Sequence, residues 1–193
     1  SCMVKAAQKG LCMNDIDAWV QWWALPWRYA HPHWQILDAS PALLRNQHAG
    51  ASKSLGIAPC LPCAPTTSLM QLALAQPAHY DALLQRVERI CRTTPSAARD
   101  DTQRLWCQRL ARALHTQDWL EPADDPLQLL RAWLEPPVWQ RLRLRFAPAR
   151  IETLEQKPVP AISPAKLRTL WQTVLWHTRP RDEGHNHADT PHD

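Results

Sequence analysis

Three pairs of residues mark helix starts in this chain and constrain its fold more than any other feature. Each pair places a Ser or Asp before a proline: Ser40-Pro41, Asp125-Pro126 and Ser163-Pro164. The Ser or Asp side chain can cap a helix, and proline suits the first helical position because the N–H that it lacks has no partner there. The pairs predict helices over "ASPALLRNQ" (39–47), "DPLQLLRAWLE" (125–135) and "SPAKLRTLWQTVLWHTR" (163–179).

Apolar residues at helical spacing predict the remaining helices. The stripe within 163–179 is the clearest, because its members recur at three- and four-residue steps, as on one face of a helix: Leu167, Leu170, Trp171, Val174 and Leu175. Further helices are predicted at about 14–24, 67–75, 78–92 and 97–116. The fold class is therefore predicted to be all-α.

The segment "WQRLRLRF" (139–146) fits two kinds of secondary structure. Its arginines at every second position alternate with apolar residues, as on a half-buried strand. A helix also fits, because one helical face would collect Val138, Trp139, Leu142 and Phe146. The sequence leaves open one short strand or β-hairpin near 139–155 within the otherwise helical fold.

The domain organisation follows from length and from the distribution of Gly and Pro. A chain of 193 residues usually forms one domain. We expect residues 1–178 to form a single helical domain with a surface loop at about 46–66, where two of the four glycines and several prolines occur. The tail 179–193 has no apolar period and is expected to be disordered.

The cysteines and the apolar content indicate a cytoplasmic protein. Six cysteines without a signal peptide are typical of reduced thiols, and the first thirty residues contain no uncharged apolar stretch of the kind that a signal peptide needs. No segment approaches the roughly 18–20 apolar residues of a membrane span, so direct membrane insertion is not expected.

Two groups of residues could bind a metal or carry out thiol chemistry. His31 and His33 flank Pro32, and the proline predicts an extended path on which the two rings diverge, so a structural corner is favoured over a metal site. Cys60 and Cys63 form "CLPC", which has the form of a redox motif but lacks the strand before it and the helix after it. Plain loop cysteines are favoured over a zinc half-site or a redox pair.

Motifs for catalysis are missing from the sequence. It contains no nucleophile elbow, Walker loop, HExxH or GxGxxG. His185 and His187 in the tail could bind metal only weakly. We therefore predict that the protein is not an enzyme and uses no cofactor or metal.

The best candidate for a binding surface is the row Arg141, Arg143 and Arg145. Residues 123–178 hold eight Lys or Arg and five Asp or Glu, which is the largest net positive charge of any part of the chain. Trp139 lies beside the row, and Trp and Arg are enriched at protein interfaces. The row predicts docking on an acidic protein surface, with a solvated helix or strand face and nucleic-acid binding as alternatives.

Two segments resemble a known family. "LPWRYAHPHW" (25–34) resembles the N-terminal motif of the cytoplasmic K component of bacterial type III secretion systems, the SctK or YscK-like family, in which a Pro is followed by Tyr-x-His and often Pro. The matching positions are Pro26, Tyr29, His31 and Pro32, with Trp34 at a position usually filled by a bulky residue. "WQRLRLRFAP" (139–148), followed by "LRTLWQTVLW" (167–176), resembles the closing segment of the family.

The resemblance implies a non-enzymatic helical adaptor of the cytosolic sorting platform. Such an adaptor links the cytoplasmic domain of the inner-membrane ring protein, the D component, to the pod protein, the Q component, at the cytosolic face of the apparatus. No catalytic residue is implied, and "CLPC" and the His-bearing tail depart from the family pattern. The runner-up hypothesis from the residues is a basic helical nucleic-acid-binding module, and a thiol or zinc enzyme is third.

Overall fold

The computed structural model describes residues 13–34, 48–92 and 101–178 of the chain. Within these residues the secondary structure is helical, with no strand, which confirms the predicted all-α fold class. The elements in chain order are α1 (Met13–Ala24), η1 (Pro26–Tyr29), α3 (His48–Ser54), α4 (Thr67–Ala73), α5 (Pro77–Cys91), α6 (Asp101–Leu114), α7 (Leu127–Trp133), α8 (Pro136–Leu142), η2 (Arg143–Arg145), α9 (Pro148–Glu155) and α10 (Pro164–His177).

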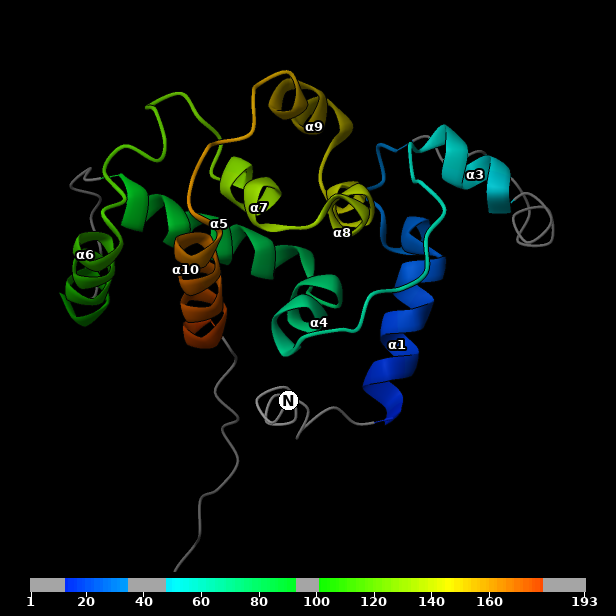
Figure 1. Ribbon diagram of the computed structural model, residues 1–193, viewed down its shortest axis with the longest axis horizontal. Coiled ribbons are helices and arrows are strands. Elements are labelled where there is room, and N and C mark those ends of the chain that lie inside the picture. Colours follow the sequence, from blue (N-terminus) through cyan, green and yellow to red (C-terminus); the bar gives the residue numbers. More distant parts are fainter. Residues whose placement is uncertain (1–12, 35–47, 93–100, 179–193) are drawn as a thin grey trace, which may run out of the picture.

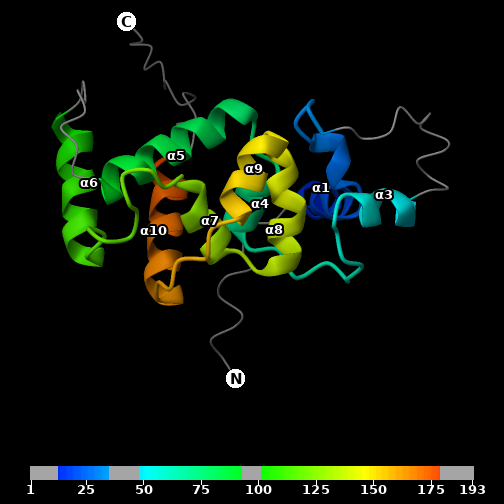
Figure 2. The same ribbon diagram turned by 90° about the horizontal axis from the view of Figure 1, so that it is seen from above.

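The helices form an elongated arrangement. Helix α6 lies at one end, α1 and α3 lie at the other, and α5, α7 and α10 lie between them (Figures 1 and 2). Helix α5 packs against both α6 and α10, and α10 also packs against α7 and α4. The C-terminal helix α10 is therefore central in the packing.

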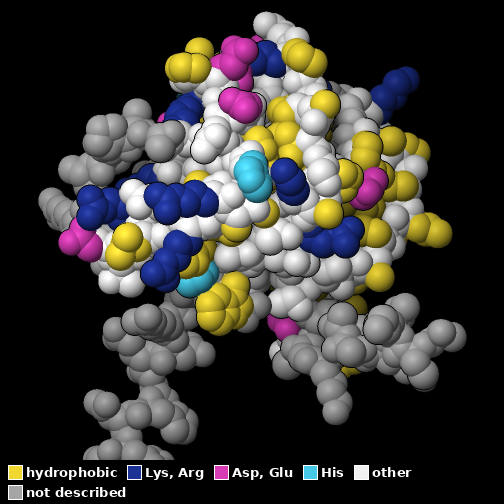
Figure 3. All heavy atoms as spheres, turned by 60° about the vertical axis from the view of Figure 1, so that its left-hand side comes forward, with side chains coloured by type: hydrophobic (Ala, Val, Ile, Leu, Met, Phe, Trp, Pro, Cys, Tyr) yellow, Lys and Arg dark blue, Asp and Glu magenta, His cyan; other side chains and the backbone are white. Residues whose placement is uncertain are grey.

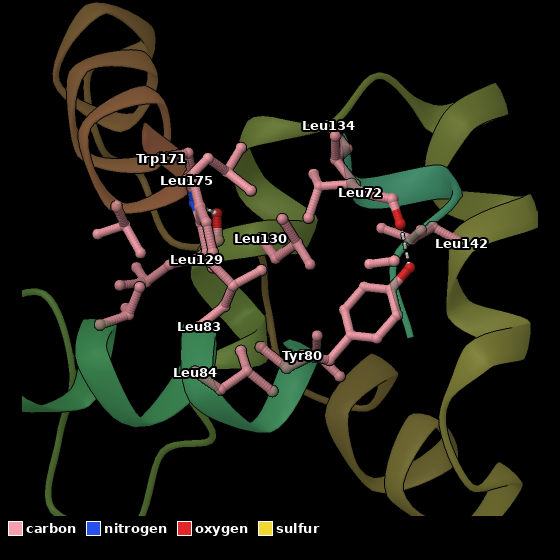
Figure 4. Packing of buried hydrophobic residues seen from close by; sticks show 14 of the residues in the cluster. Leu72, Tyr80, Leu83, Leu84, Leu129, Leu130, Leu134, Leu142, Trp171 and Leu175 are labelled. Atoms are coloured by element: carbon pink, nitrogen blue, oxygen red, sulfur yellow. Dashed lines mark hydrogen bonds between the residues drawn. The ribbon is translucent and has the colours of Figure 1, made fainter. Parts of the chain in front are cut away.

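A core rich in leucine lies between α4, α5, α7 and α10, and we call it the leucine core (Figure 4). Leu83 of α5, Leu129 of α7 and Trp171 of α10 are each no more than 1% exposed. The indole N–H of Trp171 donates to the carbonyl of Leu129 at 3.1 Å, and its ring stacks on that of Trp133. The stripe predicted for α10 is buried in full, because its apolar face meets α5, α7 and α4.

Proline is the first residue of η1, α5, α8, α9 and α10, and it directly precedes α7 at the predicted Asp-Pro start. At α7 the Asp125 carboxylate accepts the amide N–H of Leu127 at 2.9 Å, as a helix cap does. The Ser163 side chain makes no such bond at α10, where Pro164 alone marks the start. Helices α5, α8 and α9 begin at Pro77, Pro136 and Pro148 after residues other than Ser or Asp. The rule that required Ser or Asp before proline therefore missed α8 and α9.

The alternative of a strand or hairpin near 139–155 is wrong. Residues 136–145 form α8 and η2, and 148–155 form α9. The helix forms because Pro136 and Pro148 start helical turns and because Val138, Trp139 and Leu142 share a buried helical face. The spacing of the arginines at every second residue therefore does not reflect a strand, because all three lie in helical segments.

Other predictions need correction or lie outside the described residues. The loop at 46–66 is partly wrong, because it includes α3. Ala51 of α3 and Leu55, which follows it, pack against Trp27 and Leu144. The predicted helices at 14–24, 67–75 and 78–92 correspond to α1, α4 and α5. The helix predicted at 39–47, the first part of the one at 97–116, and the tail 179–193 fall outside the described residues.

Candidate functional site

The two segments that carry the family resemblance meet in space. The amide N–H of His31 donates to the carbonyl of Leu144 at 2.7 Å, and the indole N–H of Trp34 donates to the carbonyl of Phe146 at 2.8 Å. The Arg145 guanidinium returns a bond to the carbonyl of Tyr29 at 3.0 Å. We call this contact between residues 26–34 and 139–146 the junction.

The proline-rich segment forms the corner that its sequence predicts. Helix α1 ends at Ala24, and buried Pro26 starts η1, which redirects the chain. Tyr29 and Trp34 are half-buried and pack against the core, whereas Pro32 is exposed. The corner is thus held by aromatic packing and by the bonds to Leu144 and Phe146.

The expectation that the His31 and His33 rings diverge is wrong. The ring centroids lie 4.8 Å apart at 74°. Residues 31–34 form a turn, closed by a bond from the amide of Trp34 to the carbonyl of His31, instead of the extended path that Pro32 suggested. The Nδ1 atom of His31 accepts the amide N–H of His33 at 3.2 Å, so the pair stabilises its own turn.

Arg141 lies inside the protein. It is 5% exposed, its Nε donates to the carbonyl of Trp23 at 3.0 Å, and its Nη1 donates to the carbonyl of Pro137 at 2.9 Å. The guanidinium carbon lies 4.0 Å from the centre of the Trp23 ring, in a cation–π contact. Arg141 therefore fixes the end of α1 on α8.

Arg143 holds α3 and α9 to the junction. Its Nη1 pairs with Glu155 Oε2 at 2.8 Å, and its Nη2 donates to the carbonyl of Leu55 at 2.7 Å. The other oxygen of Glu155 accepts the indole N–H of Trp139 at 2.8 Å. Gly56 has a positive φ of 65°, and a Cβ there would lie 2.8 Å from Arg143 Nη2, so both the turn and the close approach require glycine.

Arg145 donates hydrogen bonds to backbone carbonyls in two other parts of the chain. Besides Tyr29, it donates to the carbonyls of Ala73 at the end of α4 and of Ala75 just after it, and its Nε lies 3.4 Å from the Tyr80 hydroxyl. The guanidinium also lies over the rings of Tyr29 and Tyr80. Burial raises the pKa of Tyr80, although the charge of Arg145 opposes this, and the Tyr80 hydroxyl donates to Leu72 in the leucine core (Figure 4).

The expectation that this row presents exposed guanidinium groups to a partner is therefore wrong. The side chains of Trp139 and Arg141 are buried, and Arg143 and Arg145 are bonded within the protein. Docking of an acidic partner at Trp139, Arg141, Arg143 and Arg145 stays a prediction. No local sequence signal could have shown the burial, because the carbonyls that accept from Arg141 and Arg145, apart from that of Pro137, lie 70 to 118 residues away in the chain.

A group of exposed arginines lies at the opposite end of the molecule, on α5 and α6. Figure 3 shows Lys and Arg side chains gathered on the face that contains the α6 end. On α5 and α6 the exposed arginines are Arg89, Arg104, Arg109 and Arg112. In the described part of the chain, Arg104 pairs with Asp101 on its own helix, and the other three form no ion pair.

Cys60 and Cys63 lie in an extended segment that α1 holds in place. The indole N–H groups of Trp23 and Trp19 donate to the carbonyls of Cys60 and Cys63 at 3.1 and 3.2 Å. Both thiols are free and exposed, and partial burial raises the pKa of Cys63. Because neither thiol lies at a helix start, the segment lacks the feature that activates a redox cysteine.

In the described residues, the candidate site is built from hydrogen bonds, ion pairs and ring contacts within the protein. Among residues 13–34, 48–92 and 101–178, no three His, Cys, Asp or Glu side chains lie close enough to hold a metal ion. In the same described ranges, no helix has the length and apolar character that a membrane span needs. Comparison with protein families, curated proteins and solved structures finds no match to this chain.

Proposed function

We propose that the protein is a non-enzymatic helical adaptor of the cytosolic sorting platform of a bacterial type III secretion system. In this proposal it works in the cytoplasm as the K component, and it links the D component of the inner-membrane ring to the Q component of the pods. The proposal begins from the resemblance of residues 25–34 and 139–148 to that family.

The observation that supports the proposal is the junction. The two resembling segments are separated by over a hundred residues in the chain, yet Trp34 bonds Phe146 and Tyr29 bonds Arg145. Because residues 25–34 contact residues 139–148, a substitution in either segment changes the packing of the other. The amino acids allowed in the two segments therefore depend on each other. An adaptor also needs a stable scaffold rather than a reactive centre, and the junction supplies such support.

Co-purification tests the proposal directly. Tagged full-length protein is co-expressed with the cytoplasmic domain of the D component, and separately with the Q component, of the same secretion system. We expect at least one of them to co-purify in a stoichiometric complex. A tagged helical protein of similar size and charge is the control, and a folded sample that binds neither component would contradict the proposal.

A nucleic-acid-binding module is the second candidate, and the exposed arginines of α5 and α6 are the observation that favours it. Phosphate contacts release counterions, so such binding would weaken steeply as salt is raised. Fluorescence anisotropy with a short labelled DNA duplex and a labelled RNA, at low and high salt, tests this candidate. The double change Arg109→Glu and Arg112→Glu is expected to abolish any salt-sensitive binding that occurs.

A further inference from the structure

A cavity of about 800 Å³ opens at the end of the molecule formed by α1 and α3. Its walls come from the end of α1, from α3, from residues 56–60 and from α8. The residues that matter for the argument are Trp23, Ala49, Lys53, Ile57, Cys60 and Arg141. A volume of this size suits a side chain or a short peptide segment, since binding pockets usually measure roughly 300–1,000 Å³.

Arg141 brings a buried positive charge to this cavity. It is 5% exposed, and burial lowers the pKa of its guanidinium, but an arginine stays charged at neutral pH. Its protein partners are the carbonyls of Trp23 and Pro137, the face of the Trp23 ring and the side chain of Cys60, which lies within hydrogen-bonding reach. Within the described ranges, Arg141 forms no ion pair with a carboxylate.

A buried cation without an anion is costly to the fold. Carbonyl dipoles and an aromatic face stabilise the charge in part, but they do not neutralise it. An anion that entered the cavity would gain from the low local dielectric. Lys53 adds a second, exposed cation on α3 beside the same cavity.

The rest of the lining is largely apolar, and this selects the kind of anion. Trp23 and Ile57 are buried core residues, and Ala49, Ala58 and Pro59 lie beside them in the wall. A small hydrated anion such as phosphate could pair with the same cations, but it would lose water against the apolar wall without any apolar contact in return. A carboxylate side chain with an apolar neighbour matches both the cations and the apolar wall.

We propose that this cavity binds an acidic side chain, together with an adjacent apolar side chain, from a partner protein. The inference rests on the proposed adaptor function, whose D and Q components supply the proteins to be tested. It also revises the predicted interface: Arg141 contributes from within the cavity, and Arg143 and Arg145 support the fold around it.

Two variants at exposed residues test the cavity without disturbing Arg141, whose loss would release the carbonyls of Trp23 and Pro137. Ala49→Trp fills the cavity, and Lys53→Glu reverses the charge on α3. Their matched controls are Ala113→Trp on α6 and Arg168→Glu on α10, both at exposed residues outside the cavity. Isothermal titration calorimetry measures the Kd of each full-length variant for the D-component domain and for the Q component, and thermal melting verifies the fold.

We expect each cavity variant to weaken binding by about tenfold or more, because a filled pocket and a repelling charge each oppose an acidic side chain. The controls are expected to stay within about twofold of wild type. If wild type binds and both cavity variants bind equally well, the cavity inference is overturned while the adaptor proposal stands. If folded wild type binds neither component, both are overturned.

Discussion

The leucine core and the junction are held together in different ways. In the leucine core, apolar side chains on α5, α7 and α10 meet at helical spacing, and Trp171 adds one hydrogen bond to Leu129. In the junction, three arginines donate to backbone carbonyls from four other parts of the chain, and two of the arginines lie against aromatic rings. The first is stabilised mainly by apolar burial and the second largely by directional polar bonds.

This difference predicts how each region responds to substitution. Apolar burial has no preferred direction, so the leucine core should tolerate swaps that conserve volume. The junction should not tolerate a change of Arg to Lys, because a guanidinium donates in several fixed directions and an ammonium does not. The comparison can be tested by single substitutions in each region.

The largest expected loss of stability is at Trp171. Trp171→Ala removes a side chain that is fully buried between α10, α7 and α5, and it should lower the free energy of unfolding by about 4 kcal/mol. Urea denaturation measures the change. Trp176→Ala on the same helix, where the side chain is 65% exposed, is the control and should change it by less than about 0.5 kcal/mol.

The junction should come next. Arg145→Met keeps the apolar stem but leaves the carbonyls of Tyr29 and Ala75 without their donor, and we expect a loss of about 3 kcal/mol. Arg145→Lys should recover less than half of this loss, since one ammonium cannot reach both carbonyls in the same geometry. Urea denaturation beside the exposed control Arg168→Met tests both; a loss no larger than the control's would mean that the junction bonds contribute little to stability.

A smaller effect is expected at Asp125, whose ion pair joins α7 of the leucine core to α9. Burial of the Asp125 carboxyl raises its pKa, but bonds from Arg150, at 2.6 and 2.8 Å, and from the Leu127 amide lower it more, so the net pKa lies below the usual value. The folded state therefore favours the ionised form. Its contribution is present above the unfolded pKa of about 4 and is lost as pH falls below that value.

The matched measurement for Asp125 is urea denaturation between pH 7 and pH 3. Asp125→Asn should cost about 1.5 kcal/mol at pH 7, and the difference from wild type should shrink below about pH 4. The same change in a variant that already carries Arg150→Met should cost less, because the partner is gone. A difference that stays constant with pH would show that the pair does not depend on the charge of Asp125.

The smallest effect on stability is expected from modification of the exposed thiols, and the same reaction tests how firmly α5 packs against α6. Cys60 and Cys63 are exposed, whereas burial raises the pKa of Cys91 to about 12 even though Arg92 lowers it in part. N-ethylmaleimide at pH 8 should modify Cys60 and Cys63 rapidly and leave Cys91 and Cys107 intact until urea is added. Peptide mass spectrometry measures this, and rapid modification of Cys91 in native protein would show that the helix pair α5 and α6 opens readily.

The helical part of the fold could be predicted because its causes are local. The stripe of α10 and the apolar faces of α4 and α5 lie within single segments, and proline starts act on the residue that follows them. The starts of α8 and α9 were missed because Pro136 and Pro148 follow Glu and Ala, which do not cap a helix with their side chains. The corner at Pro26 was predicted for the same local reason.

The candidate site could be predicted only in part. The sequence singled out Arg141, Arg143 and Arg145, but it predicted exposed groups for an acidic partner. Charge counted along the chain does not show which cations face solvent. The exposed arginines of α5 and α6 add little to the net charge of their segment, because acidic residues lie near them in the sequence. The cavity beside Arg141 had no sequence signal, because its walls come from four separate segments.

The sequence by itself determined that this chain folds into helices, and where most of them begin, because periodicity and capping act within a few residues. Only the tertiary structure decided what the arginines do. A guanidinium can donate to a carboxylate, a carbonyl or water, and the choice depends on which groups the fold brings within reach. Here the fold places the carbonyls of Trp23, Leu55 and Tyr29 beside α8 and η2. Arg141 is therefore buried, and Arg143 and Arg145 are half-buried and bonded within the protein.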